Sequence, residues 1–346
     1  MSSSSAPPAG GEFVPAEVSR GVLPTSTPQA EAWGRRQLPP VEEVRPGVWA
    51  IPVPVRVAIR YVYCYLILGT EHAVLIDPGE KSKEAAEALS AAFAQIGFDE
   101  RQLVGILVTH FHFDHWEGAD ELAERTGAWV ALSRREWEWV QALTADDTSP
   151  EGMLEWFLSF GAPPETALEL ATTADYRDTL VYRAPDHLLE PGEFLPISGE
   201  RLQVIDTPGH SPGHVCLYDH QRDVLFSGDH ILPNITPHIA LNRFGAPDPL
   251  SDYLESLERV GRLGEPEVLP AHEYRFTGLA ARIDELRADI EQRADEVRAL
   301  VAQHTALTPW DAASQLTWSR QWHVFQPAQR RMATDETAAH FARLGL

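Results

Sequence analysis

Cysteine and long apolar runs are both scarce in this sequence. Its 346 residues include only two cysteines, Cys64 and Cys216, which cannot form a disulfide framework. Both lie in apolar, strand-like segments, so we expect buried thiols in a protein of a reducing compartment. No segment approaches the roughly 18 consecutive apolar residues of a membrane-spanning helix. The first residues, MSSSSAPPAGGEF, lack the basic and apolar regions of a signal peptide, so we expect a cytoplasmic protein without membrane contacts.

Basic residues are also scarce. Lysine and arginine number 28 against 51 aspartates and glutamates, which gives a formal net charge of −23. Nucleic-acid binders need a basic face that releases phosphate counterions, and docking on anionic lipid needs basic residues as well. The charge therefore argues against nucleic acids and membranes as partners. The hydrophobic content of 44% is typical of a globular protein with a sizeable core.

The chain begins with a polar tail that leads into a body of mixed structure. Residues 1–40 are rich in Ser, Pro, Ala and Gly without periodicity, which predicts a disordered tail; the alternative for residues 33–38 is packing on the body. Residues 41–276 alternate strand and helix patterns, as α/β and α+β folds do. We expect strands over 48–55, 61–68, 73–76, 103–109, 129–132, 201–205, 214–218, 224–227 and 267–269, and helices over 83–96, 118–126 and 250–263.

Two segments depart from this alternation. Residues 133–189 carry tryptophan and phenylalanine at helical spacings, with prolines as breakers, which predicts a helical insertion in the body. Residues 277–346 have an almost entirely helical pattern. One long amphipathic helix is expected over 278–302, and shorter helices near 309–316 and 328–344, so we predict a C-terminal all-helical domain.

The strongest chemical signal is the segment THFHFDH over residues 109–115. Its four potential ligands, which follow directly on a predicted buried strand, are His110, His112, Asp114 and His115. A loop that leaves a strand can point all four side chains in one direction, whereas a helix would distribute them around its circumference. Imidazole and carboxylate groups are ligands for zinc and related metals. The segment therefore predicts a metal centre.

Four shorter motifs stand where other predicted strands end. They are Asp77 in IDPG, His210 in PGH, Asp229 in SGD and His272 in AH. In open α/β sheets, functional groups collect at such strand ends. We therefore expect these four side chains to gather with the segment THFHFDH at one edge of a sheet.

In this order the motifs resemble those of the metallo-β-lactamase superfamily, and the resemblance covers residues 41–276. It implies an αββα sandwich of two mixed sheets with helices outside and the metals at one edge. It also implies two divalent metal ions per chain. The implied ligands are His110, His112 and His210 for one ion and Asp114, His115 and His272 for the other, with Asp229 bridging both and Asp77 supporting the ligands.

Residue 229 is Asp rather than Cys, which departs from the antibiotic-degrading members and is similar to the hydrolase branch. In that chemistry two divalent ions about 3.5–4 Å apart hold a bridging hydroxide, which serves as the nucleophile, and one ion stabilises the oxyanion. Asp114 is then expected to relay a proton to the leaving group, with metal-bound water as the alternative. Zinc is the expected metal, while manganese and iron accept the same ligand types.

We therefore predict a hydrolase of a small acyl substrate, a thioester or an ester, with a lactone as the next choice. A ribonuclease and a non-hydrolytic diiron module are the alternatives. The C-terminal helices resemble the small winged-helix-like domain of a subgroup that includes a β-lactamase-like endoribonuclease and thioesterases. A homodimer is left open.

Several residues outside the ligand set are candidates for the substrate pocket, and we expect at least one aromatic ring of the insertion to contact the substrate. Each candidate has a structural alternative, which is a place in the core for the aromatic residues and a loop position for the others. His214 is expected to brace the turn PGHSPGH, and His230 to point away from the metals. The pocket candidates are Trp116, Trp137, Trp139, Trp156, Phe157, His238 and Tyr274.

Overall fold

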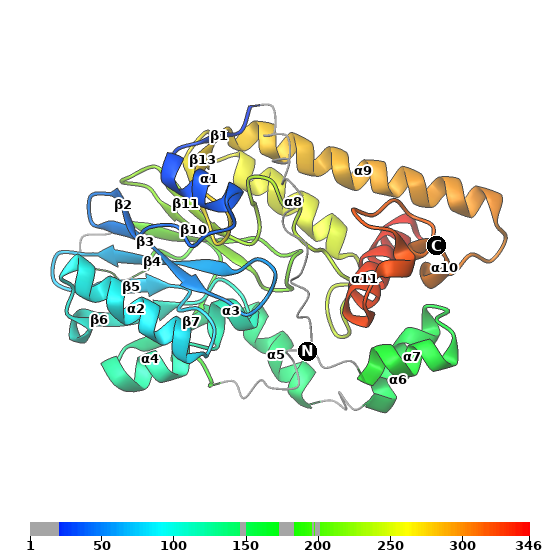
Figure 1. Ribbon diagram of the computed structural model, residues 1–346, viewed down its shortest axis with the longest axis horizontal. Helices are drawn as coiled ribbons and strands as arrows, with labels where there is room; N and C mark the ends of the chain where they lie inside the picture. The colour runs from blue at the N-terminus through cyan, green and yellow to red at the C-terminus, as the bar shows by residue number, and fades with distance from the viewer. Residues whose placement is uncertain (1–20, 146–149, 173–182, 196, 198–200) are drawn as a thin grey trace, which may run out of the picture.

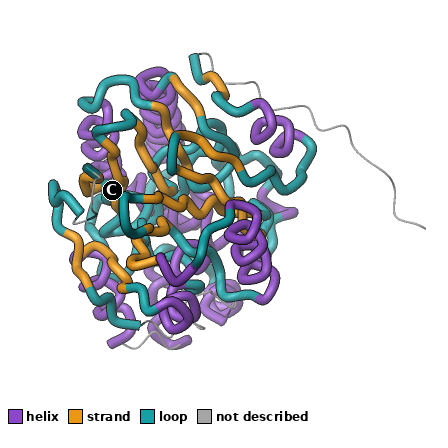
Figure 2. The backbone as a smooth tube through the Cα atoms, turned by 90° about the vertical axis from the view of Figure 1, so that its left-hand side faces the viewer, coloured by secondary structure: helices purple, strands orange, loops and turns teal. Residues whose placement is uncertain are grey.

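The computed structural model of the chain describes residues 21–145, 150–172, 183–195, 197 and 201–346. These residues form two mixed β-sheets packed face to face (Figure 1). Helices lie around the strands, as the view turned by 90° also shows (Figure 2). The predicted αββα sandwich is therefore confirmed.

Seven strands make up the first sheet. The pairs from β2 to β5 are antiparallel, and those from β5 to β8 are parallel. A turn at residues 69–72 joins the antiparallel strands β4 and β5. In spatial order the strands are β2 (Glu42–Arg45), β3 (Val48–Pro54), β4 (Tyr61–Leu68), β5 (Ala73–Ile76), β6 (Leu103–Leu107), β7 (Trp129–Ser133) and β8 (His187–Leu189).

Six strands make up the second sheet. All neighbours are antiparallel except β11 and β12, which run parallel because α8 (Pro249–Gly261) connects them. In spatial order the strands are β1 (Leu23–Pro24), β13 (Phe276–Thr277), β12 (Glu267–Pro270), β11 (Val224–Gly228), β10 (Val215–Asp219) and β9 (Leu202–Asp206).

The core lies between the two sheets and under the outer helices. Side chains alternate along a strand, so one set of each sheet faces the other sheet and the opposite set faces helices. Both cysteines are buried in this interior, as expected, and burial raises the pKa of Cys216 to about 12. The side chains between the sheets include Tyr65, Ile67, Ile76 and Leu107 of the first sheet and Leu217, Phe226 and Leu269 of the second.

Helices cover both outer faces of the sandwich. Helix α2 (Lys83–Ile96) shows how the sequence sets these elements. Its N-cap residue Ser82 accepts a hydrogen bond from the amide of Ala85, and Gly97 ends it with a φ of 77°, a left-handed conformation that glycine adopts without steric cost. The first sheet is covered by α2, α4 (Ala119–Thr126) and α5 (Arg134–Ala145), and the second by α8 and α9 (Leu279–Gln303).

The helical insertion and the C-terminal helices pack against each other. Beyond α5, the described part of residues 133–189 contains α6 (Pro150–Ser159) and α7 (Pro164–Thr172); residues 146–149 and 173–182 of the predicted insertion lie outside the described residues. One apolar cluster joins Phe157 and Leu170 of these helices to Ala338. The C-terminal partners are α10 (Pro309–Ala313) and α11 (Pro327–Leu344).

The structure corrects the prediction of a disordered tail for residues 21–40; residues 1–20 lie outside the described part. Strand β1 pairs with β13, and α1 (Thr27–Gly34) follows it. Gln29 is fully buried, and its side chain accepts a hydrogen bond from the amide of Arg275 at 3.0 Å. The prediction failed because such short elements carry no periodicity of their own and are held by contacts with distant residues.

No helix among the residues that the structure describes is long and apolar enough to span a membrane. Residues 278–346, all of which are described, contain helices and no strand. The β wing that a winged-helix domain would add is therefore not present in this segment.

Replacing Phe157 by alanine should destabilise the protein by about 3–5 kcal/mol, because a fully buried ring leaves a cavity between α6, α7 and α11. Leu158→Ala is the matched control, since Leu158 is the next residue along the chain and its side chain is 41% exposed. Urea unfolding measures both free energies of unfolding. A loss at Phe157 no larger than that at Leu158 would contradict the packing role.

Candidate metal centre

Seven predicted ligands converge at one edge of the sandwich. The segment that follows β6 carries four of them and includes the short helix α3 (Phe113–Trp116). His210 lies between β9 and β10, Asp229 directly follows β11, and His272 follows β12. Their donor atoms form two groups, each within 4.8 Å, namely His110, His112, His210 and Asp229 in the first cluster and Asp114, His115 and His272 in the second.

The first cluster brings three imidazoles together. Nδ1 of His112 lies 2.8 Å from Nε2 of His110 and 3.0 Å from Nε2 of His210. Nε2 of His210 is in turn 3.5 Å from a carboxylate oxygen of Asp229. These donor atoms all lie within 4.8 Å of one another, which is close enough for them to bind a single ion.

The second cluster lies beside the first, and Asp229 touches both. Oδ2 of Asp114 is 3.7 Å from Nε2 of His115 and 3.5 Å from Nε2 of His272. The carboxylate of Asp229 lies 3.6 Å from the same atom of His115 and 3.2 Å from that of His272. Two donors about 2.1 Å from one tetrahedral zinc ion are roughly 3.4 Å apart, so these spacings fit a dinuclear metal site.

Two donor atoms of the site have no hydrogen-bond partner within the described part of the chain. They are Nε2 of His115 and Oδ1 of Asp229, which are buried and have only ion-pair contacts, the closest at 3.6 Å to Asp229 for the first and 3.2 Å to His272 for the second. A buried polar atom without a partner costs about 1–3 kcal/mol. Coordination of a cation would satisfy both atoms, which supports a fit between this donor set and a metal.

Four of the five histidines in the two clusters are oriented by a hydrogen bond at Nδ1, the ring nitrogen that does not face the other ligands. In each, Nδ1 contacts an oxygen outside the clusters and leaves Nε2 facing inward. Such outer contacts fix the tautomer and ring orientation of metal-binding histidines. The Nδ1 partners are Thr109 Oγ1 for His110 at 3.0 Å, Asp77 Oδ2 for His115 at 2.8 Å, the His238 carbonyl for His210 at 2.9 Å and the Tyr61 carbonyl for His272 at 2.8 Å.

Asp77 occupies the supporting position expected of it. Its carboxylate accepts hydrogen bonds from the amide and the hydroxyl of Thr109, both at 2.8 Å, and contacts His115. Its φ is 53°, a left-handed conformation that aspartate tolerates better than most residues. Asp77 therefore links the end of β5 to both clusters.

The electrostatics of the site separate the histidines into two groups. Burial lowers the pKa of His110 and His112 well below the usual range and that of His210 to about 4, which favours the neutral ring that binds metals. Burial also disfavours the charged form of His115 and His272. There the neighbouring carboxylates of Asp114 and Asp229 prevail and raise the pKa.

His214 and His230 behave differently from the seven. Nδ1 of His214 contacts the hydroxyl of Thr207 at 2.8 Å, and its Nε2 accepts a hydrogen bond from the amide of Asp229 at 3.2 Å. His214 therefore braces its turn as predicted and also holds Asp229. His230 is fully buried and packs against Tyr253, outside both clusters.

Glu136 is a supporting residue that the sequence did not reveal. Its buried carboxylate accepts hydrogen bonds from the amide of Phe111 at 2.9 Å, the hydroxyl of Ser211 at 2.5 Å and the amide of Gly213 at 2.6 Å. One residue of α5 therefore ties the segment around His110 to the segment around His210. Burial raises the pKa of Glu136 to about 7, although the three bonds oppose this shift.

The tryptophans nearest the ligands are mainly core residues. Trp116 is 3% exposed and packs against the half-buried Trp137, with ring centres 6.2 Å apart. Trp139 is 5% exposed and packs against Phe111, while its indole N–H donates to the carbonyl of Arg243. The structure therefore assigns Trp116 and Trp139 the core alternative, and a substrate contact of Trp137 stays a prediction.

Three further pocket candidates, Trp156, Phe157 and Tyr274, also make contacts within the protein interior. Phe157 is fully buried between helices, so the structure gives it the core alternative, and Trp156 packs beside Phe160 in the same apolar cluster. Tyr274 is 4% exposed, and its hydroxyl accepts a hydrogen bond from Asn234. A stripe of aromatic residues on a helix does not reveal which partner it faces, and here the partner is α11.

His238 is the pocket candidate that lies at the metal centre. Its carbonyl accepts the hydrogen bond from His210, and its half-buried ring lies 3.5 Å from the carboxylate of Glu336 on α11. His112, His210 and Asp229 are also only half-buried. These side chains form the open face of the site.

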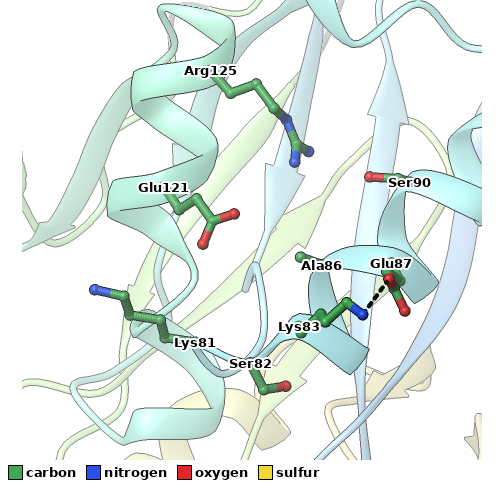
Figure 3. A pocket seen from close by; sticks show the side chains of 8 residues that line it. All are labelled: Lys81, Ser82, Lys83, Ala86, Glu87, Ser90, Glu121 and Arg125. Atoms are coloured by element: carbon green, nitrogen blue, oxygen red, sulfur yellow. Dashed lines mark ion pairs between the residues drawn. The ribbon is translucent and has the colours of Figure 1, made fainter.

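A separate pocket lies between α2 and α4 (Figure 3). Its volume is about 550 Å³, and its lining contains none of the seven ligands. Charged side chains of both signs surround it, including the pair Lys83 and Glu87 at 3.4 Å. The metal centre is therefore not part of this pocket.

Comparison with known proteins supports the fold and the class of site. The family model described as "Metallo-beta-lactamase superfamily" matches residues 58–272. The chain is 26% identical to "Probable metallo-hydrolase YqjP" of Bacillus subtilis, over 78% of this chain and 84% of that protein. It is 27% identical to "Acyl-coenzyme A thioesterase MBLAC2" of Gallus gallus, over 60% of this chain and 71% of that protein.

A solved structure supports the fold over almost the whole chain. A beta-lactamase domain protein from Burkholderia ambifaria aligns with a TM-score of 0.79 and 24% identity, over 95% of this chain and 94% of that one. The likeness therefore includes the C-terminal helices. The family model ends at residue 272, and the resemblance of residues 277–346 to a winged-helix-like domain stays unconfirmed.

Replacing Glu136 by glutamine should weaken metal binding about tenfold, because changes to groups that orient metal ligands typically cost 10–100-fold. The amide nitrogen of glutamine is a donor, so it cannot accept the hydrogen bonds that a carboxylate oxygen of Glu136 accepts from the amide of Phe111 or Gly213. Competition with a chromophoric chelator measures the affinity. Glu138→Gln, an exposed position on the same helix, is the control, and equal affinities of the two variants would contradict the role of Glu136.

Proposed function

The chain belongs to the metallo-β-lactamase superfamily, and on this basis we propose that it is a hydrolase that uses two divalent metal ions to cleave a thioester or ester of a small acyl group. The observation that carries the proposal is the pair of His and Asp clusters joined by Asp229. All seven donors are nitrogen or oxygen atoms, and zinc is the proposed metal because it accepts both types.

The two clusters divide the proposed ligands. His110, His112 and His210 would hold one ion, Asp114, His115 and His272 would hold the other, and Asp229 would bridge them. When bound, such a pair supplies Lewis-acid polarisation of the substrate carbonyl and activation of water at neutral pH. The chain itself then needs no serine or cysteine nucleophile, in agreement with the burial of both cysteines.

Asp114 is the proposed proton carrier. It and Asp229 are the only carboxylates of the two clusters, and Asp229 lies between the clusters, in contact with His115 and His272. Asp114 sits at the edge of the second cluster. It is therefore the carboxylate better suited to receive a proton and deliver it to the leaving atom.

A relative and the charge of the chain support the substrate class. The Gallus gallus protein named as an acyl-coenzyme A thioesterase is 27% identical to this chain over 60% of its length. A net charge of −23 opposes the binding of RNA, whose affinity for proteins depends on neutralised phosphates. Phe113 lies between the ligands His112 and Asp114 in the chain, His238 binds His210 through its carbonyl, and both residues are partly exposed, so we place the acyl group against them.

Removing the metals with a chelator should abolish thioester hydrolysis, and zinc, manganese or iron should restore it. Asp229→Ala should lower kcat/KM at least about 100-fold, because the clusters lose their common donor. The control is Asp295→Ala on α9, where the carboxylate is 74% exposed. Turnover is measured on acyl-thioesters, lactones and labelled RNA. Metal-dependent cleavage of RNA without thioester hydrolysis would overturn the proposal in favour of a nuclease.

Replacing His238 by alanine should raise KM about threefold to tenfold, because the imidazole that we place beside the substrate is lost. The metal content should stay unchanged, because the backbone carbonyl of residue 238 still binds His210. The exposed His304 provides the control variant, His304→Ala. Steady-state kinetics and metal analysis test both. An unchanged KM would remove His238 from the substrate-binding residues.

A further inference from the structure

The segment between β11 and α8, residues 229–248, lies between the metal centre and the C-terminal helices. We call it the β11–α8 loop. It begins with the bridging candidate Asp229 and contains His238. Contacts of this loop therefore connect the C-terminal helices to the metal ligands.

On one side the loop supports a ligand of each cluster. The carbonyl of His238 accepts the hydrogen bond from His210 at 2.9 Å. The carboxylate of Glu273, which directly follows His272, accepts hydrogen bonds from the amides of Asn234 at 2.8 Å and Ile235 at 3.1 Å. Glu273 is fully buried with a φ of 72°, an unfavourable conformation that these bonds stabilise.

On the other side the loop is held by α9 and α11. Arg282 of α9 donates from Nε to the carbonyl of Leu232 at 2.7 Å and from Nη2 to that of Ile235 at 2.9 Å. Its side chain is 4% exposed. The amide of Leu241 donates to the carbonyl of Asp335 on α11 at 3.1 Å. Figure 1 shows α9 starting beside the second sheet and running away from it, and Asp289 of this helix accepts a hydrogen bond from the hydroxyl of Thr236 in the loop at 3.1 Å.

We propose that the C-terminal helices position the metal ligands through the β11–α8 loop, with Arg282 as the positioning residue. A guanidinium group can bind two carbonyls at once in a fixed geometry, and Arg282 holds those of Leu232 and Ile235. Ile235 is also bound by Glu273, the neighbour of His272. A displacement of the loop would therefore turn ligands in both clusters. This inference rests on the metal-binding part of the proposed function and not on the substrate.

The test measures zinc affinity without substrate, by competition with a chromophoric chelator, on folded full-length variants. Arg282→Met keeps the apolar stem and removes both bonds, and Arg282→Lys keeps the charge without the paired geometry. Zinc affinity should fall about threefold to tenfold in both, toward the lower end of what outer ligand contacts contribute. The control is Glu291→Ala, which removes the ion pair of α9 with Arg343 of α11 and does not touch the loop.

The outcomes separate positioning from a purely structural role. Lower stability of the metal-free protein with unchanged zinc affinity would overturn the proposal. If Arg282→Met does not fold, Thr236→Val decides, because it removes the hydrogen bond that the exposed Thr236 of the loop donates to the carboxylate of Asp289 on α9 at 3.1 Å. An unchanged affinity there would also count against positioning. A protein that binds zinc with the expected differences but cleaves no thioester would support this inference and contradict the proposed substrate.

Discussion

The crowding of five imidazoles and two carboxylates is the constraint on which the rest of the structure depends. Nδ1 of His112 lies 2.8 Å from one ring nitrogen and 3.0 Å from another, and lone pairs at such distances repel each other unless a proton or a cation lies between them. The polar atoms of His115 and Asp229 that lack partners add a desolvation cost of about 1–3 kcal/mol each. A bound cation relieves both terms, so metal binding and stability are coupled here.

Until a cation binds, the chain itself must hold these groups in place, and every part of it contributes. Asp77 at the end of β5 orients His115, and the carbonyl of Tyr61 orients His272. The hydroxyl of Tyr61 also donates to the carbonyl of Glu273 at 2.6 Å. Tyr61 of the first sheet therefore binds the segment that follows β12 of the second sheet. Glu136 of the insertion joins the remaining two ligand segments. The residues around the site therefore connect the two sheets through hydrogen bonds.

The sequence predicted what depends on local pattern and could not predict what depends on distant contacts. The segment THFHFDH and the strand ends at residues 210, 229 and 272 identified the donors that meet in the structure, and the strand end at residue 77 identified their support. Glu136 escaped notice because it stands among exposed charges in RREWEW, and only the fold brings Phe111 and Ser211 to its carboxylate. The order of residues 21–40 also depends on distant partners, such as Arg275 for Gln29.

The aromatic insertion is connected to the metal centre through α11. Phe157 packs against α11, where the guanidinium of Arg331 lies 5.5 Å from its ring centre and Ala338 completes the apolar cluster. Glu336, which contacts His238 at the open face, lies on the same helix between these two residues. Because a helix moves as a rigid element, the packing of the insertion sets the position of Glu336. The insertion is therefore connected to His238 through α11, and a direct contact of one of its rings with the substrate stays a prediction.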